Sequence, residues 1–517
     1  MTGQSEIGIE LNNVSPWDRL STAVVIVASL GSAAASLLLL IKHDVLSGPG
    51  DQLGFYAQAE RLLPFKDHYL GPGYFVTIRL VHDLLHLDWF LAAKVISLVS
   101  AWLSLILTFL IARQLLDKTS ARFATALVAI NPIFISQSYS SLTIMYGAVW
   151  ALFAIWATLA NRRMRLRGYF AAGLIFGLAS LVRFQNNGLL LGALAGFVIL
   201  PEITWSKRIA GATVLLLGWV IPTVSWSAYL GQVQGSAPEN YNFVHLTYAF
   251  GEFNDFFQVH VLVEKYKSTL GVLTSHWSNP LRIAAFATKE ALKFPFGVGF
   301  RLLFLAAGWL LPGMVVVATC RRLHGPWLGA FLAALFLTGI GSRGWLHYYT
   351  LFIPFCSILV ANVIGATDVA EHRPIGVRGR LVWALILGST VCWSPVIVWN
   401  TFQSSNWSEY KPAVRFLEEE KTPQLLVCST ASTISYGASF AFVGQSSLLQ
   451  PKELPNLVNI LRKNKVTHLV VTRHTLYDYP DLAVLLEDSP TKIPDGLRRE
   501  LLITSPERLA IYRVLGP

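Results

Sequence analysis

The segment Lys42–Phe75, KHDVLSGPGDQLGFYAQAERLLPFKDHYLGPGYF, lies between two long apolar runs. Its first turn cluster, Ser47 to Gly50, is followed by Asp51 at a position that suits a helix N-cap. Apolar residues then recur at helical spacing until Pro64 ends the pattern. A second turn, Gly71-Pro72-Gly73, leads into the next apolar segment. We therefore expect a structured loop at a membrane face, with Asp51 at the start of a helix that lies along the surface.

The composition of the whole chain indicates a membrane protein. Of its 517 residues, 53% are hydrophobic and only 14% are charged, and the mean hydropathy is +0.50. A soluble protein needs more charge than this to cover its surface. Apolar runs long enough to cross a bilayer recur over the first 400 or so positions. Only helices satisfy their own backbone in such runs, so we expect a polytopic α-helical protein whose first apolar run is a retained helix.

The apolar runs predict about eleven transmembrane helices with the N-terminus in the cytoplasm. The expected spans are 20–41, 89–112, 121–137, 143–160, 168–183, 187–201, 209–230, 300–319, 326–341, 346–364 and 381–400. With this topology every cytoplasmic loop is basic, as the positive-inside rule requires. The net charge of +11 is therefore explained by topology and does not indicate nucleic-acid binding.

The exoplasmic side then receives the loop 42–88, the short turn near Arg183, the segment 231–299 and the chain after about residue 401. The segment 231–299 is rich in aromatic residues, which predicts interfacial helices. We expect a transmembrane domain over 1–401 and a small exoplasmic α/β domain over 402–517, with strands at 424–430, 467–473 and 509–515 and a helix at 455–464. The four cysteines are scattered and suggest neither disulfides nor a zinc site.

Asp51 is the first candidate for chemistry. A carboxylate at the membrane surface can take a proton from an acceptor hydroxyl as a general base, or hold a divalent cation against a phosphate. The alternative is that Asp51 only caps its helix. Asp44 stands in the same loop, and we interpret it as a solvated charge.

Two cationic segments stand at the ends of spans on the same face. Arg183 in LASLVRFQNNG is followed by three amides, and it can clamp a lipid-linked phosphate because a guanidinium matches phosphate oxygens. Its alternative role is snorkelling to the headgroups. The second segment is GSRGWLHYYTLFIP. It offers a cation, a hydrogen-bond donor and a ring on which a sugar can stack, from Arg343, His347 and Tyr348. The alternative interpretation is an aromatic belt at the membrane surface with one anchoring Arg.

The sequence contains no Walker A motif, no GxGxxG, no HExxH and no GxSxG. Without a loop for nucleotide phosphates, a transferred group has to arrive already activated, and a lipid carrier is the natural donor for a site at a membrane face.

The chain resembles the GT-C fold glycosyltransferases that use lipid-linked sugars. It is most similar to bacterial relatives of the dolichyl-phosphate-mannose–protein mannosyltransferases and the aminoarabinose–lipid A transferases. The resemblance rests on short motifs that cover most of the chain: Asp51 with Tyr56 and Ala59; Gly71-Pro72-Gly73-Tyr74; Gly177-Leu178-Ala179 with Arg183; and His347, Tyr348 and Pro354.

The resemblance implies that Asp51 acts near the acceptor or a metal, and that Arg183, Arg343 and His347 bind the donor phosphate. Tyr56, Tyr74 and Tyr348 are the expected substrate contacts. The chain departs from the family where a second acid is expected: Gln52 follows Asp51, and Ile144 stands at the other acidic position. The chain therefore lacks the acids for a two-carboxylate metal site at these positions. Whether the reaction needs a divalent metal ion is left open by the sequence.

The leading hypothesis is a glycosyltransferase that moves a sugar from a polyprenyl phosphate to an exoplasmic protein, lipid or polysaccharide acceptor, in a bacterial inner membrane. The runner-up is a polytopic transporter or lipid flippase, which would need charges or broken helices near the bilayer midplane. A non-catalytic membrane scaffold is the third hypothesis. The sequence leaves the sugar, the acceptor and the carrier length open.

Overall fold

The protein was analysed as a computed structural model. The structure describes residues 16–42, 55, 58–65, 71–140, 142–161, 165–199, 204–235, 242–253, 259–291, 325–341, 348–369, 410–420, 425–429, 441–444, 456–472, 475–490, 493–504 and 508–516.

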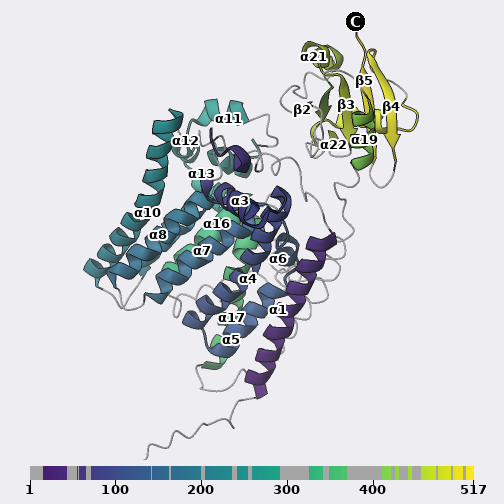
Figure 1. The fold of residues 1–517 in the computed structure, drawn as a ribbon. Coiled ribbons are helices and arrows are strands. Elements are labelled where there is room, and N and C mark those ends of the chain that lie inside the picture. Colours follow the sequence, from purple (N-terminus) through teal and green to yellow (C-terminus); the bar gives the residue numbers. More distant parts are fainter. Residues whose placement is uncertain are drawn as a thin grey trace, which may run out of the picture.

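A bundle of apolar helices forms the larger part of the described structure (Figure 1). Within the described residues, four helices are long and apolar enough to cross a membrane: α1 (Pro16–Lys42), α4 (Trp89–Leu115), α7 (Thr143–Ala160) and α10 (Trp205–Gln234). Further helices complete the bundle: α5 (Lys118–Ala129), α6 (Pro132–Gln137), α8 (Leu166–Val182), α9 (Asn186–Gly196) with the 3-10 turn η1 (Phe197–Ile199), α16 (Gly325–Gly341) and α17 (Tyr349–Val369).

The described helices cover nine of the eleven expected spans, and the expected spans 300–319 and 381–400 lie outside the described residues. The single helix expected over 121–137 is wrong, because α5 and α6 are separate helices. Asn131 stands between them, and its side-chain oxygen accepts from the backbone N–H of Ile133 at 3.0 Å, while Pro132 occupies the first turn of α6. This cap and the proline start a new helix inside an apolar run.

Glycine lets two helix pairs approach until their backbones touch. On α9, a Cβ added at Gly192 would lie 2.3 Å from the carbonyl oxygen of Gly329 on α16, and a Cβ at Gly329 would lie 1.9 Å from the carbonyl oxygen of Gly192. Between α8 and α10, a Cβ at Gly173 would lie 2.1 Å from the carbonyl oxygen of Leu215. Small residues at such crossings replace the hydrophobic effect as the source of helix association in lipid, because close packing and dispersion then stabilise the contact.

Helix α3 (Pro72–Leu85) begins against the end of α8. A Cβ at Gly71 would lie 2.0 Å from the carbonyl oxygen of Leu181, and one at Gly73 would lie 2.9 Å from a methyl group of Val182. The Gly-Pro-Gly turn therefore allows a contact that larger residues would prevent. It fixes the start of α3 beside the last turn of α8, directly before Arg183.

The segment 231–299 contains the expected helices within its described residues. These are η2 (Asn242–Phe250), α11 (Val259–Tyr266), α12 (Thr269–Thr274) and α13 (Asn279–Ala291). Helix α13 packs against α16, where a Cβ at Gly339 would lie 1.8 Å from the carbonyl oxygen of Ala287.

Residues 410–516, called the C-terminal domain below, contain a five-stranded sheet in the order β2-β1-β3-β5-β4 (Figure 1). Strands β1 (Leu426–Ser429), β2 (Ala441–Gly444) and β3 (His468–Thr472) are parallel, and β5 (Leu509–Val514) pairs antiparallel with β3 and with β4 (Leu497–Ile503). Its helices are α19 (Lys411–Glu419), α21 (Leu457–Lys463), α22 (Thr475–Asp478) and the 3-10 helix η8 (Pro480–Leu486). The three strands and the helix expected from the sequence are present.

Candidate active site

Arg183 is the residue that directly follows α8, and two neutral groups hold its side chain. Its Nη1 donates to Oγ1 of Thr143 at 3.2 Å, and its Nε donates to Oε1 of Gln185 at 3.1 Å. Thr143 is the first residue of α7, and Gln185 stands directly before α9. Three helix ends therefore converge on the guanidinium. Both acceptors are neutral, and together they orient the guanidinium.

A glycine makes room for the Arg183 side chain. A Cβ added at Gly147, one turn after Thr143 on α7, would lie 3.2 Å from Cδ and 3.3 Å from Cβ of Arg183. The aliphatic part of Arg183 therefore lies against bare helix backbone. Its charged end is half-buried, which is how a long cationic side chain combines an apolar stem with a polar tip.

Tyr348 covers the guanidinium from the start of α17. The ring centroid of Tyr348 lies 5.4 Å from Cζ of Arg183, within the range of a cation–π interaction. The sequence hypothesis placed Arg183 and Tyr348 at one site although 165 positions separate them. The structure brings these two residues together.

Tyr74, Tyr146 and Thr77 form a second group of contacts, which joins α3 to α7. The Tyr146 hydroxyl lies 2.9 Å from Oγ1 of Thr77 on α3, and the rings of Tyr74 and Tyr146 are 5.9 Å apart. Tyr74 has no exposed surface and also contacts the ring of Phe55. Tyr146 is partly exposed and stands on α7 one turn after Thr143. Within the described residues, Tyr146 is thus the more accessible ring of this pair.

The amides after Arg183 have different tasks. Nδ2 of Asn186 donates to the carbonyl oxygens of Gly147 at 3.2 Å and Ala179 at 2.9 Å, so it ties α9 to α7 and α8. Oδ1 of Asn187 accepts from Nε1 of Trp219 on α10 at 2.8 Å. Of the three amides, Gln185 contacts Arg183, whereas the two asparagines hold together the helices that position it.

Four of the expected site residues, Asp51, Tyr56, Arg343 and His347, lie outside the described residues. Ile144, which occupies the expected acidic position, is buried on α7. The sequence analysis did not single out Thr143 or Tyr146. The sequence feature that could have identified them is the run of hydroxyl residues in SSLTIMY at the start of an apolar span. Hydroxyls at the end of a buried helix need hydrogen-bond partners.

Residues 70–226 match the family model described as dolichyl-phosphate-mannose-protein mannosyltransferase. This range includes Arg183, Thr143, Tyr146 and Tyr74. No curated protein matches the chain in the comparison.

Solved membrane enzymes share the fold of the chain. ArnT from Cupriavidus metallidurans, bound to undecaprenyl phosphate, aligns with a TM-score of 0.52 over 98% of this chain and 100% of ArnT, at 14% identity. The archaeal oligosaccharyltransferase AglB from Archaeoglobus fulgidus, in complex with an inhibitory peptide and a dolichol-phosphate, aligns with a TM-score of 0.53 over 87% of this chain and 69% of AglB, at 14% identity. In its apo form the Archaeoglobus enzyme gives a TM-score of 0.56 with the same coverage and identity.

The chain has the GT-C fold. This fold, together with the apolar helices, makes it an integral membrane protein. The family match and the helix ends around Arg183 lie in the same part of the fold, because α3, α7 and α8 all fall within residues 70–226.

Proposed function

We propose that this chain is a membrane glycosyltransferase that moves a sugar from a polyprenyl-phosphate carrier to an acceptor at the exoplasmic face. The observation that carries the proposal is the fixed guanidinium of Arg183, held by Thr143 and Gln185 and covered by Tyr348 at the meeting point of α7, α8 and α17. Such a group provides an oriented positive charge where a leaving phosphate would develop negative charge. The solved neighbours support a lipid phosphate as its partner, since AglB holds a dolichol-phosphate and ArnT an undecaprenyl phosphate.

In the proposed reaction, Asp51 takes the proton from an acceptor hydroxyl. The acceptor oxygen then bonds to the anomeric carbon of the sugar, and the bond from that carbon to the phosphate oxygen breaks. Polyprenyl phosphate leaves with one more negative charge, which Arg183, together with Arg343 and His347, stabilises. Ile144 occupies the position of a second acid, so we derive no step through a metal ion.

Three tyrosines complete the proposed site. Tyr348 and Tyr56 contact the substrate, because an aromatic ring offers a flat apolar face to a sugar. Tyr74 is fully buried behind Tyr146, so we assign it to the substrate site through Tyr146, whose ring it supports.

The proposed topology places the N-terminus in the cytoplasm of a bacterial cell and the eleven spans in its inner membrane. The loop 42–88, the segment 231–299 and the domain 402–517 then lie on the exoplasmic side. The basic loops on the opposite side support this orientation. Helices α8 and α10 run parallel, so both begin on the same side. Basic residues stand at both of these helix starts: Arg165, Arg167, Lys207 and Arg208.

A transfer assay tests the proposal. The full chain in nanodiscs receives radiolabelled polyprenyl-phosphate sugars and envelope extracts, beside the Asp51→Asn and Asp44→Asn proteins. We expect label to reach an acceptor with wild type and with Asp44→Asn, and to stay on the lipid with Asp51→Asn. Equal transfer by both variants would reduce Asp51 to a helix cap. In closed vesicles that contain the chain, movement of labelled lipid across the bilayer without any transfer would replace the enzyme by a transporter.

A further inference from the structure

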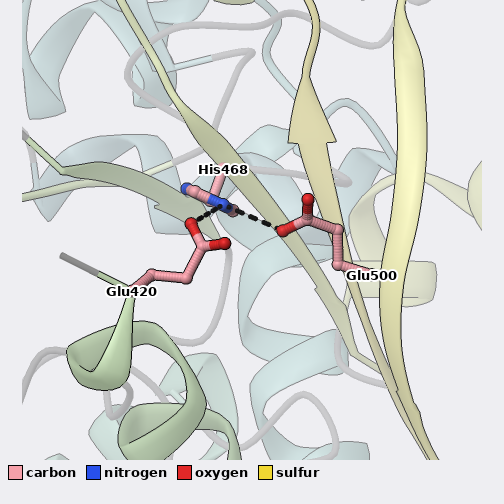
Figure 2. Close-up of side chains that lie close together, drawn as sticks. All are labelled: Glu420, His468 and Glu500. Atoms are coloured by element: carbon pink, nitrogen blue, oxygen red, sulfur yellow. Dashed lines mark hydrogen bonds and ion pairs between the residues drawn. The ribbon is translucent and has the colours of Figure 1, made fainter. Parts of the chain in front are cut away.

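A second cluster of chemically active side chains lies in the C-terminal domain, away from the site around Arg183. Glu420 follows α19, His468 begins β3, and Glu500 lies in β4, so three segments distant in sequence meet (Figure 2). Nε2 of His468 is 3.2 Å from Oε2 of Glu420 and 3.3 Å from Oε2 of Glu500. The His468 side chain is 1% exposed, and that of Glu500 is 10% exposed.

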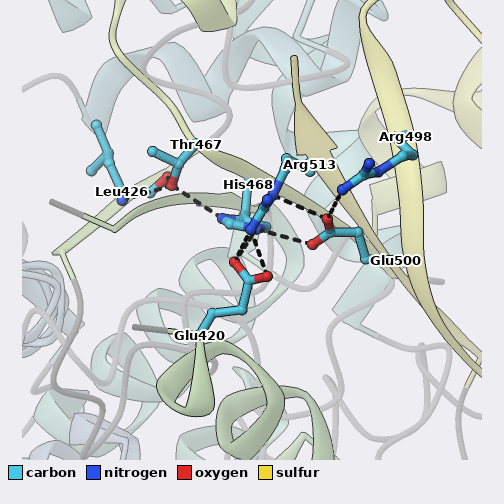
Figure 3. Close-up of polar contacts among 7 residues, drawn as sticks. All are labelled: Glu420, Leu426, Thr467, His468, Arg498, Glu500 and Arg513. Carbon is cyan, nitrogen blue, oxygen red and sulfur yellow. Dashed lines mark hydrogen bonds and ion pairs between the residues drawn. The ribbon is translucent and has the colours of Figure 1, made fainter. Parts of the chain in front are cut away.

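Thr467 determines which nitrogen of the imidazole faces the carboxylates. The Thr467 hydroxyl donates its proton to the carbonyl oxygen of Leu426 at 3.0 Å and accepts from the Leu426 N–H at 3.0 Å. Nδ1 of His468 lies 3.1 Å from the same hydroxyl oxygen (Figure 3). If the Thr467 hydroxyl gives its proton to Leu426, Nδ1 is the ring nitrogen that carries the proton and donates it to Thr467. In that tautomer, Nε2 presents a lone pair to Glu420 and Glu500.

Three electron-rich atoms therefore converge on one point. Convergent lone pairs repel each other unless a cation lies between them. Metal-binding histidines are oriented in this way, because a hydrogen bond at one ring nitrogen directs the other nitrogen to the metal.

The spacing fits a tetrahedral ion. Zinc bonds to nitrogen and oxygen ligands at about 2.0–2.1 Å, so two ligand atoms of a tetrahedral site lie about 3.3 Å apart. The two distances from Nε2 to the carboxylate oxygens match this edge, and all three ligand atoms lie within 4.8 Å of one another. The partly exposed Glu420 side chain leaves solvent access for a water molecule as the fourth ligand.

Two arginines contact the same carboxylates. Nε of Arg513 is 3.0 Å from Oε1 of Glu500, and Nη2 of Arg498 is 2.9 Å from that same oxygen, so both leave Oε2 of Glu500 to the cluster centre. Arg513 also contacts both oxygens of Glu420 (Figure 3). A carboxylate accepts several bonds at once, so an ion and an arginine can share it.

We propose that Glu420, His468 and Glu500 form a binding site for one divalent metal ion of the zinc class. The ion connects the end of α19 to β3 and β4. It therefore fastens the first helix of the C-terminal domain to its sheet. The site is independent of the proposed transfer reaction, since none of its residues belongs to the site around Arg183.

Metal analysis of the full chain tests this proposal. The purified protein in detergent is stripped with a chelator, supplied with zinc, freed of excess metal and measured for zinc by elemental analysis. We expect one zinc per wild-type chain, and its loss from Glu500→Gln and from His468→Asn. The matched control is Asp488→Asn, which removes a carboxylate of the same domain that is paired with Arg508 at 2.6 Å. This control keeps its zinc.

A second measurement separates loss of ligands from loss of folding. Cobalt in place of zinc gives a visible absorption band when it is bound tetrahedrally, and zinc raises the unfolding temperature of wild type but not of Glu500→Gln. A Glu500→Gln protein with wild-type near-ultraviolet circular dichroism and no cobalt band supports the site. A wild-type chain that retains no zinc overturns the proposal. In that case a proton on Nε2 of His468, which hydrogen-bonds to both carboxylates, explains why the three side chains lie together. Retention of zinc by both ligand variants overturns it as well.

Discussion

Nη1 of Arg183 lies 3.2 Å from Oγ1 of Thr143, so the residue after α8 is bonded to the first residue of α7. Helices α7 and α8 are antiparallel neighbours, and this bond joins them at the face where α3 begins. An arginine at the end of a membrane helix has many rotamers, and a bond to a rigid neighbour removes most of them. The guanidinium is therefore oriented before a substrate binds, which is the condition for efficient electrostatic stabilisation.

Replacement of Arg183 by Gln should lower kcat for sugar transfer by about 100-fold, the usual effect of losing one donor that stabilises developing charge. Arg183→Lys should recover only part of the activity, because an ammonium lacks the planar pair of donors. The measurement is transfer of labelled sugar in nanodiscs.

The control for this prediction is Arg208→Gln. Arg208 also stacks on an aromatic ring, with its Cζ 4.6 Å from the ring centroid of Trp205, but it stands at the opposite end of the bundle. Unchanged kcat in Arg183→Gln, or an equal loss in Arg208→Gln, would contradict the assigned role.

Removal of the Thr143 hydroxyl should impair the enzyme less than loss of Arg183 itself. Thr143→Val keeps the shape and deletes the acceptor, at a cost of about 1.5 kcal/mol for a hydrogen bond to a charged group, or about tenfold in kcat/KM. Thr143→Ser should restore activity, since it keeps the hydroxyl. Kinetics of the two variants test this prediction, and equal activity of Val and Ser would show that the bond to Arg183 does not matter for turnover.

The sequence predicted most of the membrane fold but not the details of the site. Long uncharged runs identify spans reliably because only helices satisfy their backbone in lipid. The break at Asn131 was missed because a capping side chain carries no hydropathy signal. The hydrogen bond between Thr143 and Arg183 joins residues 40 positions apart. No local sequence pattern predicts which hydroxyl of an apolar run contacts a distant arginine. The closeness of Arg183 and Tyr348 was predictable only because topology put both on one face.

A methyl group at the crossing of α9 and α16 should destabilise the bundle. The Cβ of Gly192→Ala would lie 2.3 Å from the carbonyl oxygen of Gly329, so the two helices have to separate, at a cost of about 1–3 kcal/mol. Thermal unfolding in nanodiscs should show a lower midpoint. Gly231→Ala in α10 is the matched control, because its added Cβ meets nothing within 4 Å. An unchanged midpoint in Gly192→Ala would mean that the crossing is not tight.

The ion pair between Glu252 and Lys265 in the segment 231–299 should make the local stability depend on pH. Partial burial opposes ionisation of Glu252, but hydrogen bonds from Lys265 and Tyr266, both at 2.9 Å, outweigh it and hold the pKa of Glu252 below its usual value. A lowered pKa in the folded state means that the stabilisation is present above the ordinary pKa of a glutamate, about 4.3, and is lost as the pH falls below it. Both partners are partly exposed, so the effect is less than about 1 kcal/mol.

Hydrogen exchange of the amides in α11 should therefore be faster in Glu252→Gln than in wild type at pH 7, and this difference should shrink as the pH falls below about 4 (the rates being corrected for intrinsic exchange). Glu264→Gln, an exposed acid on the same helix, should behave like wild type. A difference that persists in acid would assign the effect of Glu252 to something other than its charge.

Helix α19 runs opposite to β1, since Glu420 at its far end meets His468 at the start of β3. Tyr410, where the described chain enters the C-terminal domain, therefore lies at the end where β1 and β3 finish, in one cluster with Leu509, the partner of Thr472. Loops that follow parallel strands are where sheets of this kind hold ligands. The described chain thus enters the domain beside the edge where the parallel strands end. A ligand held at that edge would therefore lie at the end of the domain where the described chain enters it.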